Sequence, residues 1–167
     1  MLQKLNQLSI NVLLAALQEA KSLGHSCVAT EHLLLGLVGD STTMSGKLLN
    51  EAGANLSKLR VLVKVRKTVN NPMLPLPSWL QWLQAFQELP LSVNCKKTLD
   101  LALQEADGWR EDKISPEHLL LALLTVPDSG AIEILKLNSI APEEVRGTLI
   151  EALEERAGDE RKEQHND

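Results

Sequence analysis

The sequence predicts an all-α fold made of two related helical repeats. Three observations predict it: apolar residues recur at spacings of three and four, no convincing segment alternates with a period of two, and two motifs occur twice. Each repeat is expected to hold four short helices, and a pseudo-twofold axis is expected to relate the repeats. With 167 residues, 44% of them hydrophobic, the chain can bury a stable core.

The internal repeat has a constant offset of 86 residues. The string ALQEA occurs at 16–20 and again at 102–106, and EHLLLGL at 31–37 returns as EHLLLAL at 117–123. The register between the two strings needs no gap. Because two separate blocks match at one offset, the sequence indicates tandem duplication of one helical unit.

Capping residues and glycines set the ends of the expected helices. Gly24 and Gly53 lie just past two predicted C-termini, where glycine is favoured. Asn55 and Ser92 precede apolar-periodic segments and are typical N-caps. Pro116 occupies a first helical position, where its missing N–H removes no intrahelical bond. The first expected helix carries the apolar pattern from Leu5 to Ala20 and ends just before Gly24. The others are 30–38, 44–52 and 56–69, then one capped by Ser92 and reaching 109, one starting at 116, 131–137 and 142–155.

The duplicated pattern defines a single domain over residues 1–157. One repeat spans 5–69 and the other spans 91–157. The last ten residues, 158–167, are polar and acidic, and they are expected to form a disordered tail.

The connection between the repeats, residues 70–90, has an unusual composition. It begins as a proline-rich linker, and Ser78 then caps a predicted short extra helix that carries Trp79, Trp82 and Phe86 along one side. These aromatic residues are expected either to fill the seam between the repeats or to form an exposed anchor for a partner, since tryptophan is enriched at binding hot spots.

Composition limits the classes of function. The longest unbroken apolar stretch, 12–17, is far shorter than the ~18 residues of a membrane span, and the N-terminus lacks the pattern of a secretory leader or organelle presequence. Two cysteines, Cys27 and Cys95, are too few for a disulfide framework and fit a reducing compartment. We expect a protein of the bacterial, including cyanobacterial, cytoplasm, or else the mature form of a plastid stromal protein, with no membrane partner.

The charge of the chain is unevenly distributed. The net charge is −5, yet residues 1–71 carry +4 and residues 72–150 carry −5, which disfavours bulk nucleic-acid binding. A basic run follows Asn55 and is expected to be a solvated helix face or a docking surface for an acidic partner. It consists of Lys58, Arg60, Lys64, Arg66 and Lys67.

A helix of ALQEA type followed by [TP]EHLLL[GA]L, present twice, resembles the Clp N-terminal repeat domain. That domain heads the ClpC and ClpA unfoldase ATPases and also forms free-standing ClpT-type accessory proteins. The resemblance covers about residues 5–69 and 91–155 and implies a pseudo-twofold helical domain that docks substrates, adaptors or the protease core. The string from Gly39 to Leu48 is not a nucleotide loop, because it has six residues between its glycines and a leucine after Lys47.

The doubled motif places Glu31-His32 and Glu117-His118 at equivalent helix starts. The simplest interpretation is that the glutamates favour the positive helix ends and the histidines hydrogen-bond locally. The resemblance to ClpC-type N-terminal domains instead implies that Glu31 and Glu117 contact the guanidinium of phosphoarginine. The small hydroxyl residue at the start of the first helix of each repeat is present as Ser92 in the second repeat, but Asn6 takes its place in the first. A third interpretation, catalysis by Glu–His pairs, lacks a nucleophile at a matching spacing in both repeats.

The sequence therefore predicts a non-enzymatic accessory or adaptor protein of a Clp chaperone–protease system. Its expected partners are a Clp unfoldase, the protease core, adaptors or substrate proteins, and no cofactor is expected. The alternatives are a ligand- or phosphoarginine-binding sensor domain and, third, a small hydrolase. No metal is expected, because His25, Cys27 and His32 lack an evident fourth ligand.

Overall fold

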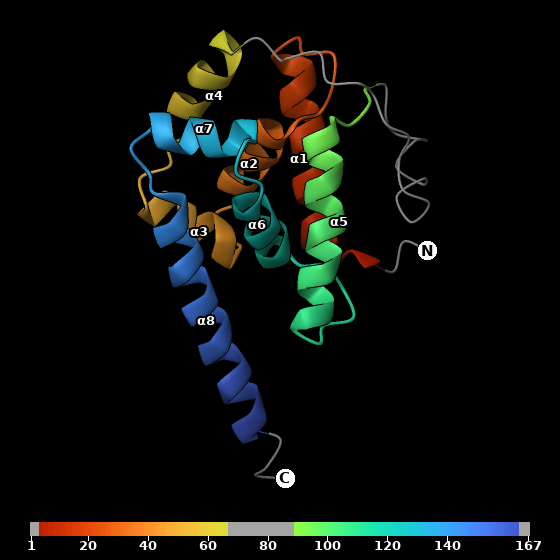
Figure 1. Ribbon diagram of the computed structural model, residues 1–167, viewed down its shortest axis with the longest axis vertical. Helices are drawn as coiled ribbons and strands as arrows, with labels where there is room; N and C mark the ends of the chain where they lie inside the picture. The colour runs from red at the N-terminus through yellow and green to blue at the C-terminus, as the bar shows by residue number, and fades with distance from the viewer. Residues whose placement is uncertain (1–3, 67–88, 164–167) are drawn as a thin grey trace.

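A computed structural model describes residues 4–66 and 89–163, and every regular element within these ranges is a helix (Figure 1). All eight expected helices are present. In chain order they are α1 (Gln7–Ser22), α2 (Thr30–Gly39), α3 (Met44–Glu51), α4 (Leu56–Val65), α5 (Val93–Gly108), α6 (Pro116–Thr125), α7 (Gly130–Leu137) and α8 (Pro142–Glu163).

Several helix ends differ from the predicted bounds, most by one or two residues, and three of the differences are informative. The first helix begins at Gln7 rather than residue 5, because the Asn6 side chain accepts a hydrogen bond from Ser9 N and acts as the N-cap. Helix α4 ends at Val65, and the predicted continuation to residue 69, like the aromatic segment, lies outside the described residues. Helix α8 runs on to Glu163, so residues 158–163 are helical and the expectation of disorder there was wrong.

The two repeats interlock through their connecting segments. Leu5 forms a parallel bridge with Ile114, and Val28 forms one with Leu91. With the offset of 86, Leu5 corresponds to Leu91 and Val28 to Ile114, so the two bridges are equivalent contacts related by the pseudo-twofold axis. The segments that precede α1 and α2 therefore form backbone hydrogen bonds with the segments that precede α6 and α5 in the other repeat. A pseudo-twofold arrangement requires such reciprocal pairs.

Helices α2 and α6 form the centre of the molecule. Each buries nine of its ten residues, because its sequence is apolar on nearly every side. The first helix packs closely on α2 at Gly36, where a Cβ atom would lie 2.6 Å from the carbonyl oxygen of Val12. Figure 1 shows the remaining helices around this pair, with the second half of α8 projecting beyond the body.

No single described helix is long and apolar enough to cross a membrane. Helices α6 and α7 meet that length and composition only when taken together, and they are bent by 86° relative to each other.

Candidate functional site

Glu117 connects the start of α6 to the start of α3 in the other repeat. Its Oε1 accepts hydrogen bonds from the amide and the hydroxyl of Ser45, at 3.3 and 3.1 Å, and the side chain is buried. The first turn of α3 offers backbone N–H groups without intrahelical partners and the positive end of a helix dipole. The Glu117 carboxylate therefore acts as a cap supplied by the opposite repeat.

Glu31 makes the corresponding connection from α2 to α7. Its carboxylate lies so close to the first turn of α7 that a Cβ atom on Gly130 would be 2.2 Å from Oε2. The residue equivalent to Ser45 is Ala131, which has no hydroxyl. The hydroxyl of Thr30 takes the place of the Ser45 hydroxyl. It accepts a hydrogen bond from Ala131 N and donates one to Glu31 Oε2, both at 3.3 Å.

Arg66 completes the surroundings of Glu31. Its Nε lies 3.9 Å from Glu31 Oε1, while Nη1 pairs with the Glu133 carboxylate and donates to the carbonyl of Gly130 at 3.4 Å. The equivalent position in the second repeat is Ala152, so Glu117 has no matching guanidinium. The two acids of the duplicated motif therefore have the same place in the fold but different partners.

Both motif histidines cap the starts of their own helices. Nδ1 of His32 accepts from Ala29 N at 2.9 Å, and Nδ1 of His118 accepts from Ser115 N at 3.0 Å. Both rings are fully buried. The ring proton of each neutral histidine therefore resides on Nε2.

The Nε2 atoms of the two histidines face different groups. In His32 this atom bonds to Nδ1 of His25 at 2.8 Å, and burial followed by the nearby His25 lowers the pKa of His32 to about 3. In His118 it makes no hydrogen bond and faces Glu111 Oε1 at 4.0 Å. Burial lowers the pKa of His118, against the opposing effect of Glu111.

The structure separates the residues that catalysis by Glu–His pairs would need to join. Glu117 bonds to α3 of the other repeat, while His118 bonds to its own helix start, and the same division holds for Glu31 and His32. Neither pair forms a dyad. No group of three potential metal ligands occurs within the described ranges.

The other predicted site residues are dispersed. Ser92 is buried, and its hydroxyl accepts from Cys95 N as the N-cap of α5, as Asn6 does for α1. Lys64 is exposed, whereas Arg66 is half-buried at Glu31. The positions that lie outside the described residues are Lys67, Trp79, Trp82 and Phe86.

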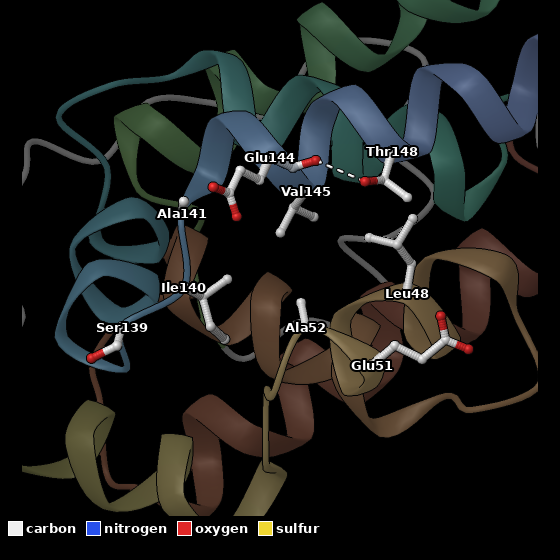
Figure 2. A pocket seen from close by; sticks show the side chains of 9 residues that line it. All are labelled: Leu48, Glu51, Ala52, Ser139, Ile140, Ala141, Glu144, Val145 and Thr148. Atoms are coloured by element: carbon white, nitrogen blue, oxygen red, sulfur yellow. Dashed lines mark hydrogen bonds between the residues drawn. The ribbon is translucent and has the colours of Figure 1, made fainter.

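A pocket between α3 and α8 was not predicted from the sequence. It has a volume of about 310 Å³, and Figure 2 shows Ile140 and Val145 pointing into the space between the helices. Its two charged lining residues are Glu51 and Glu144, one on each helix. The full lining consists of Leu48, Glu51, Ala52, Ser139, Ile140, Ala141, Glu144, Val145 and Thr148. The small residues Ala52 and Ala141 leave room for it, but only the packing of the two repeats brings them together.

Comparison with known proteins identifies the family. The sequence profile of the Clp repeat (R) N-terminal domain matches residues 4–138 and, in a second match, residues 90–166. The chain belongs to this Clp repeat family.

Similar proteins include full-length Clp chaperones. Chaperone protein ClpC2, chloroplastic, of Oryza sativa subsp. japonica is 32% identical over 155 residues, which is 93% of this chain and 16% of that protein. Chaperone protein ClpC1, chloroplastic, of Arabidopsis thaliana is 32% identical over 157 residues, with the same coverage of this chain and of the relative. The Clp repeat chain thus spans only a small part of these relatives.

Solved structures share the fold. The N-terminal domain of the chaperone ClpD from Arabidopsis thaliana superimposes with a TM-score of 0.71 and 25% identity, covering 90% of this chain and 97% of that domain. The Hsp104 N-terminal domain from Candida albicans has a TM-score of 0.66 at 17% identity, covering 90% and 91%, and shows the fold alone. The resemblance of the doubled EHLLL motif to the Clp family is therefore confirmed.

Proposed function

We propose that this Clp repeat chain acts as a non-enzymatic accessory or adaptor of a Clp chaperone–protease system. It would dock to the unfoldase, the protease core or substrate proteins. The observation that carries the proposal is that the duplicated motif has a structural role. Its four polar residues are buried and contact the first turns of helices: Glu31, His32, Glu117 and His118. The buried motif holds the two repeats together as a rigid domain, and the exposed surface of that domain is available for docking.

A groove between α1, α2 and α4 offers a surface for such docking. It has a volume of about 340 Å³, and its apolar lining includes Val12, Leu35 and Leu56. The ion pair between Arg60 and Glu19 lies along the same groove, with a bidentate contact at 2.5 to 3.1 Å. An apolar floor with a charged rim suits the anchor residue of a partner protein.

Affinity capture with mass spectrometry tests the proposal. The chain serves as bait in an extract of the source cell, under conditions that preserve the Clp protease complex. Recovery of an unfoldase, protease core or adaptor of the Clp system is the expected result. If no Clp component is enriched over an unrelated helical bait, the proposal is wrong.

Two variants on α1 map the docking surface. Ala15 is exposed and lines the groove, so Ala15→Arg places a long cation in it. Gln18 is exposed on the same helix and does not line the groove, so Gln18→Arg adds the same residue as a matched control. Docking in the groove predicts that Ala15→Arg loses the captured Clp proteins and that Gln18→Arg keeps them.

The second candidate is a sensor that binds phosphoarginine through Glu31 and Glu117. One observation favours it: the guanidinium of Arg66 already lies beside Glu31, so this carboxylate accepts that group. A ligand would have to displace Arg66 in one repeat and Ser45 in the other, because both acids are buried. Calorimetry with phosphoarginine, comparing wild type with Glu117→Gln, tests this candidate; absence of heat with wild type excludes it.

We infer the cellular compartment of the chain from that of its proposed partners. The full-length relatives are named as chloroplastic proteins, which favours the plastid stroma over a bacterial cytoplasm. Fractionation of the source cell, followed by detection of the chain beside a stromal marker, tests this assignment.

A further inference from the structure

The outward side of α4 is apolar and basic. Leu59 and Val63 are fully buried, so the opposite side of the helix faces solvent, and it carries Val61 with 62% and Val65 with 80% of its surface exposed. Two exposed lysines, Lys58 and Lys64, flank the valines on the same side. We call these four residues the α4 face.

Neither lysine of the α4 face has an ion-pair partner within the described parts of the chain. The other cations of the helix differ, because Arg60 pairs with Glu19 and Arg66 pairs with Glu133. Adjacent exposed valines are unfavourable in water unless a partner covers them. The α4 face thus combines uncovered apolar surface with uncompensated positive charge.

The pocket between α3 and α8 has the complementary chemistry. Leu48, Ile140 and Val145 are buried residues that supply its apolar lining. Both charged lining residues, Glu51 and Glu144, are acidic and exposed, and neither has an ion-pair partner among the described residues. Figure 2 shows them on opposite helices at the sides of the hollow.

One molecule cannot bring these two surfaces together. The α4 face points away from the core, because Leu59 and Val63 hold the opposite side of α4 against it. In Figure 1, α4 lies at the periphery beyond α7, whereas the pocket lies between α3 and α8. The apolar and charge complementarity of the two surfaces is therefore available only between molecules.

We infer that two copies of this chain associate head to tail, with the α4 face of one copy in the α3–α8 pocket of the next. A valine side chain of α4 enters the apolar pocket, and Lys58 and Lys64 approach Glu51 and Glu144. Complementary charge and apolar burial together supply the attraction, and the charge also sets the orientation of the two copies. Because the contact joins different surfaces, every added copy leaves one face and one pocket open.

Sedimentation equilibrium of the whole chain at low and high salt tests the inference. The expected result is a mass that rises above the 18.4 kDa of one chain with concentration and falls back as salt screens the charges. A single 18.4 kDa species at every concentration in low salt would overturn it.

Two variants each remove one surface and leave the other intact. Val61→Asn with Val65→Asn removes the apolar part of the α4 face and keeps its lysines, at a similar helix propensity. Glu51→Lys with Glu144→Lys reverses the charge of the two acidic residues that line the pocket. Glu154→Lys with Glu155→Lys is the control with the same charge change, at exposed α8 positions that do not line the pocket.

The mixture of the two surface variants gives the decisive result. Each alone is expected to be monomeric, since each lacks one of the two surfaces, while the control associates as wild type does. Mixed at equal concentrations, they should form a dimer of doubled mass and nothing larger, because one intact face meets one intact pocket. Failure of the mixture to dimerise, or association of either variant alone, would overturn the head-to-tail contact.

Discussion

Oε1 of Glu117 lies 3.1 Å from the hydroxyl of Ser45, although the two residues are 72 positions apart and belong to different repeats. The pseudo-symmetric contact joins Glu31 to the first turn of α7. Each repeat thus supplies a buried acid to a helix start of the other. The duplicated EHLLL motif consequently joins the two halves of the fold, and the halves are expected to unfold as one unit.

Removing the Glu117 carboxylate is expected to destabilise the whole domain. Glu117→Ala leaves the amide and hydroxyl of Ser45 buried without a partner, which costs about 1–3 kcal/mol. Glu117→Gln should lose less, because an amide oxygen still accepts from Ser45. Urea unfolding followed by circular dichroism measures both, with exposed Glu154→Ala as the control. A Glu117→Ala variant as stable as that control would contradict the role of this contact.

Arg66 is expected to stabilise the fold through Glu31. Arg66→Ala leaves a buried carboxylate without its cation and should cost about 1–3 kcal/mol. Lys64→Ala, two residues earlier on the exposed side, should change stability by less than about 0.5 kcal/mol. The effect of Arg66→Ala should shrink in a Glu31→Gln background, and a double-mutant cycle with no coupling would show that the two residues act independently.

Stability is expected to fall as pH drops below about 6.5, the ordinary pKa of histidine. The pKa of His32 is lowered to about 3 in the folded state, so between these values only the unfolded chain binds the proton. Within this range His32 lowers stability by roughly 1.4 kcal/mol per pH unit. Unfolding at pH 7 and pH 5 measures this, and His32→Gln should reduce the slope, because glutamine does not titrate.

Two helical glycines should respond oppositely to alanine. In Gly46→Ala the new Cβ would lie 1.9 Å from the carbonyl oxygen of Asp40, so the end of α2 must shift and stability must fall. Nothing lies within 4 Å of a Cβ at Gly147 inside α8, so Gly147→Ala should stabilise by about 0.5–1 kcal/mol. Thermal unfolding of both variants checks the signs, and a stabilised Gly46→Ala protein would contradict the described packing.

Local signals in the sequence were sufficient to predict the helices. Asn55 and Ser92 cap the helices that they were expected to cap, and the offset of 86 relates the bridge at Leu5 to the bridge at Val28. The end of α8 was missed because its last turns lack apolar periodicity. Glu, Arg and Lys are nevertheless good helix formers, and this propensity accounts for the continuation of the helix.

The sites could not be predicted because they depend on how the repeats pack. Nothing near Glu117 in the sequence indicates Ser45, and nothing near Glu51 indicates Glu144. The motif identified the acids correctly as residues at helix starts, yet their burial follows from the other repeat. The roles of Trp79, Trp82 and Phe86 remain predictions, since these residues lie outside the described part of the chain.

The most direct test of the proposed function is equilibrium binding between purified components. Labelled chain is titrated separately with the Clp unfoldase and with the Clp protease core of the same cell, and fluorescence anisotropy reports the complex. We predict saturable binding to at least one of them, unchanged by Gln18→Arg. Flat titrations with both components, for a chain that is folded by circular dichroism, would contradict the account.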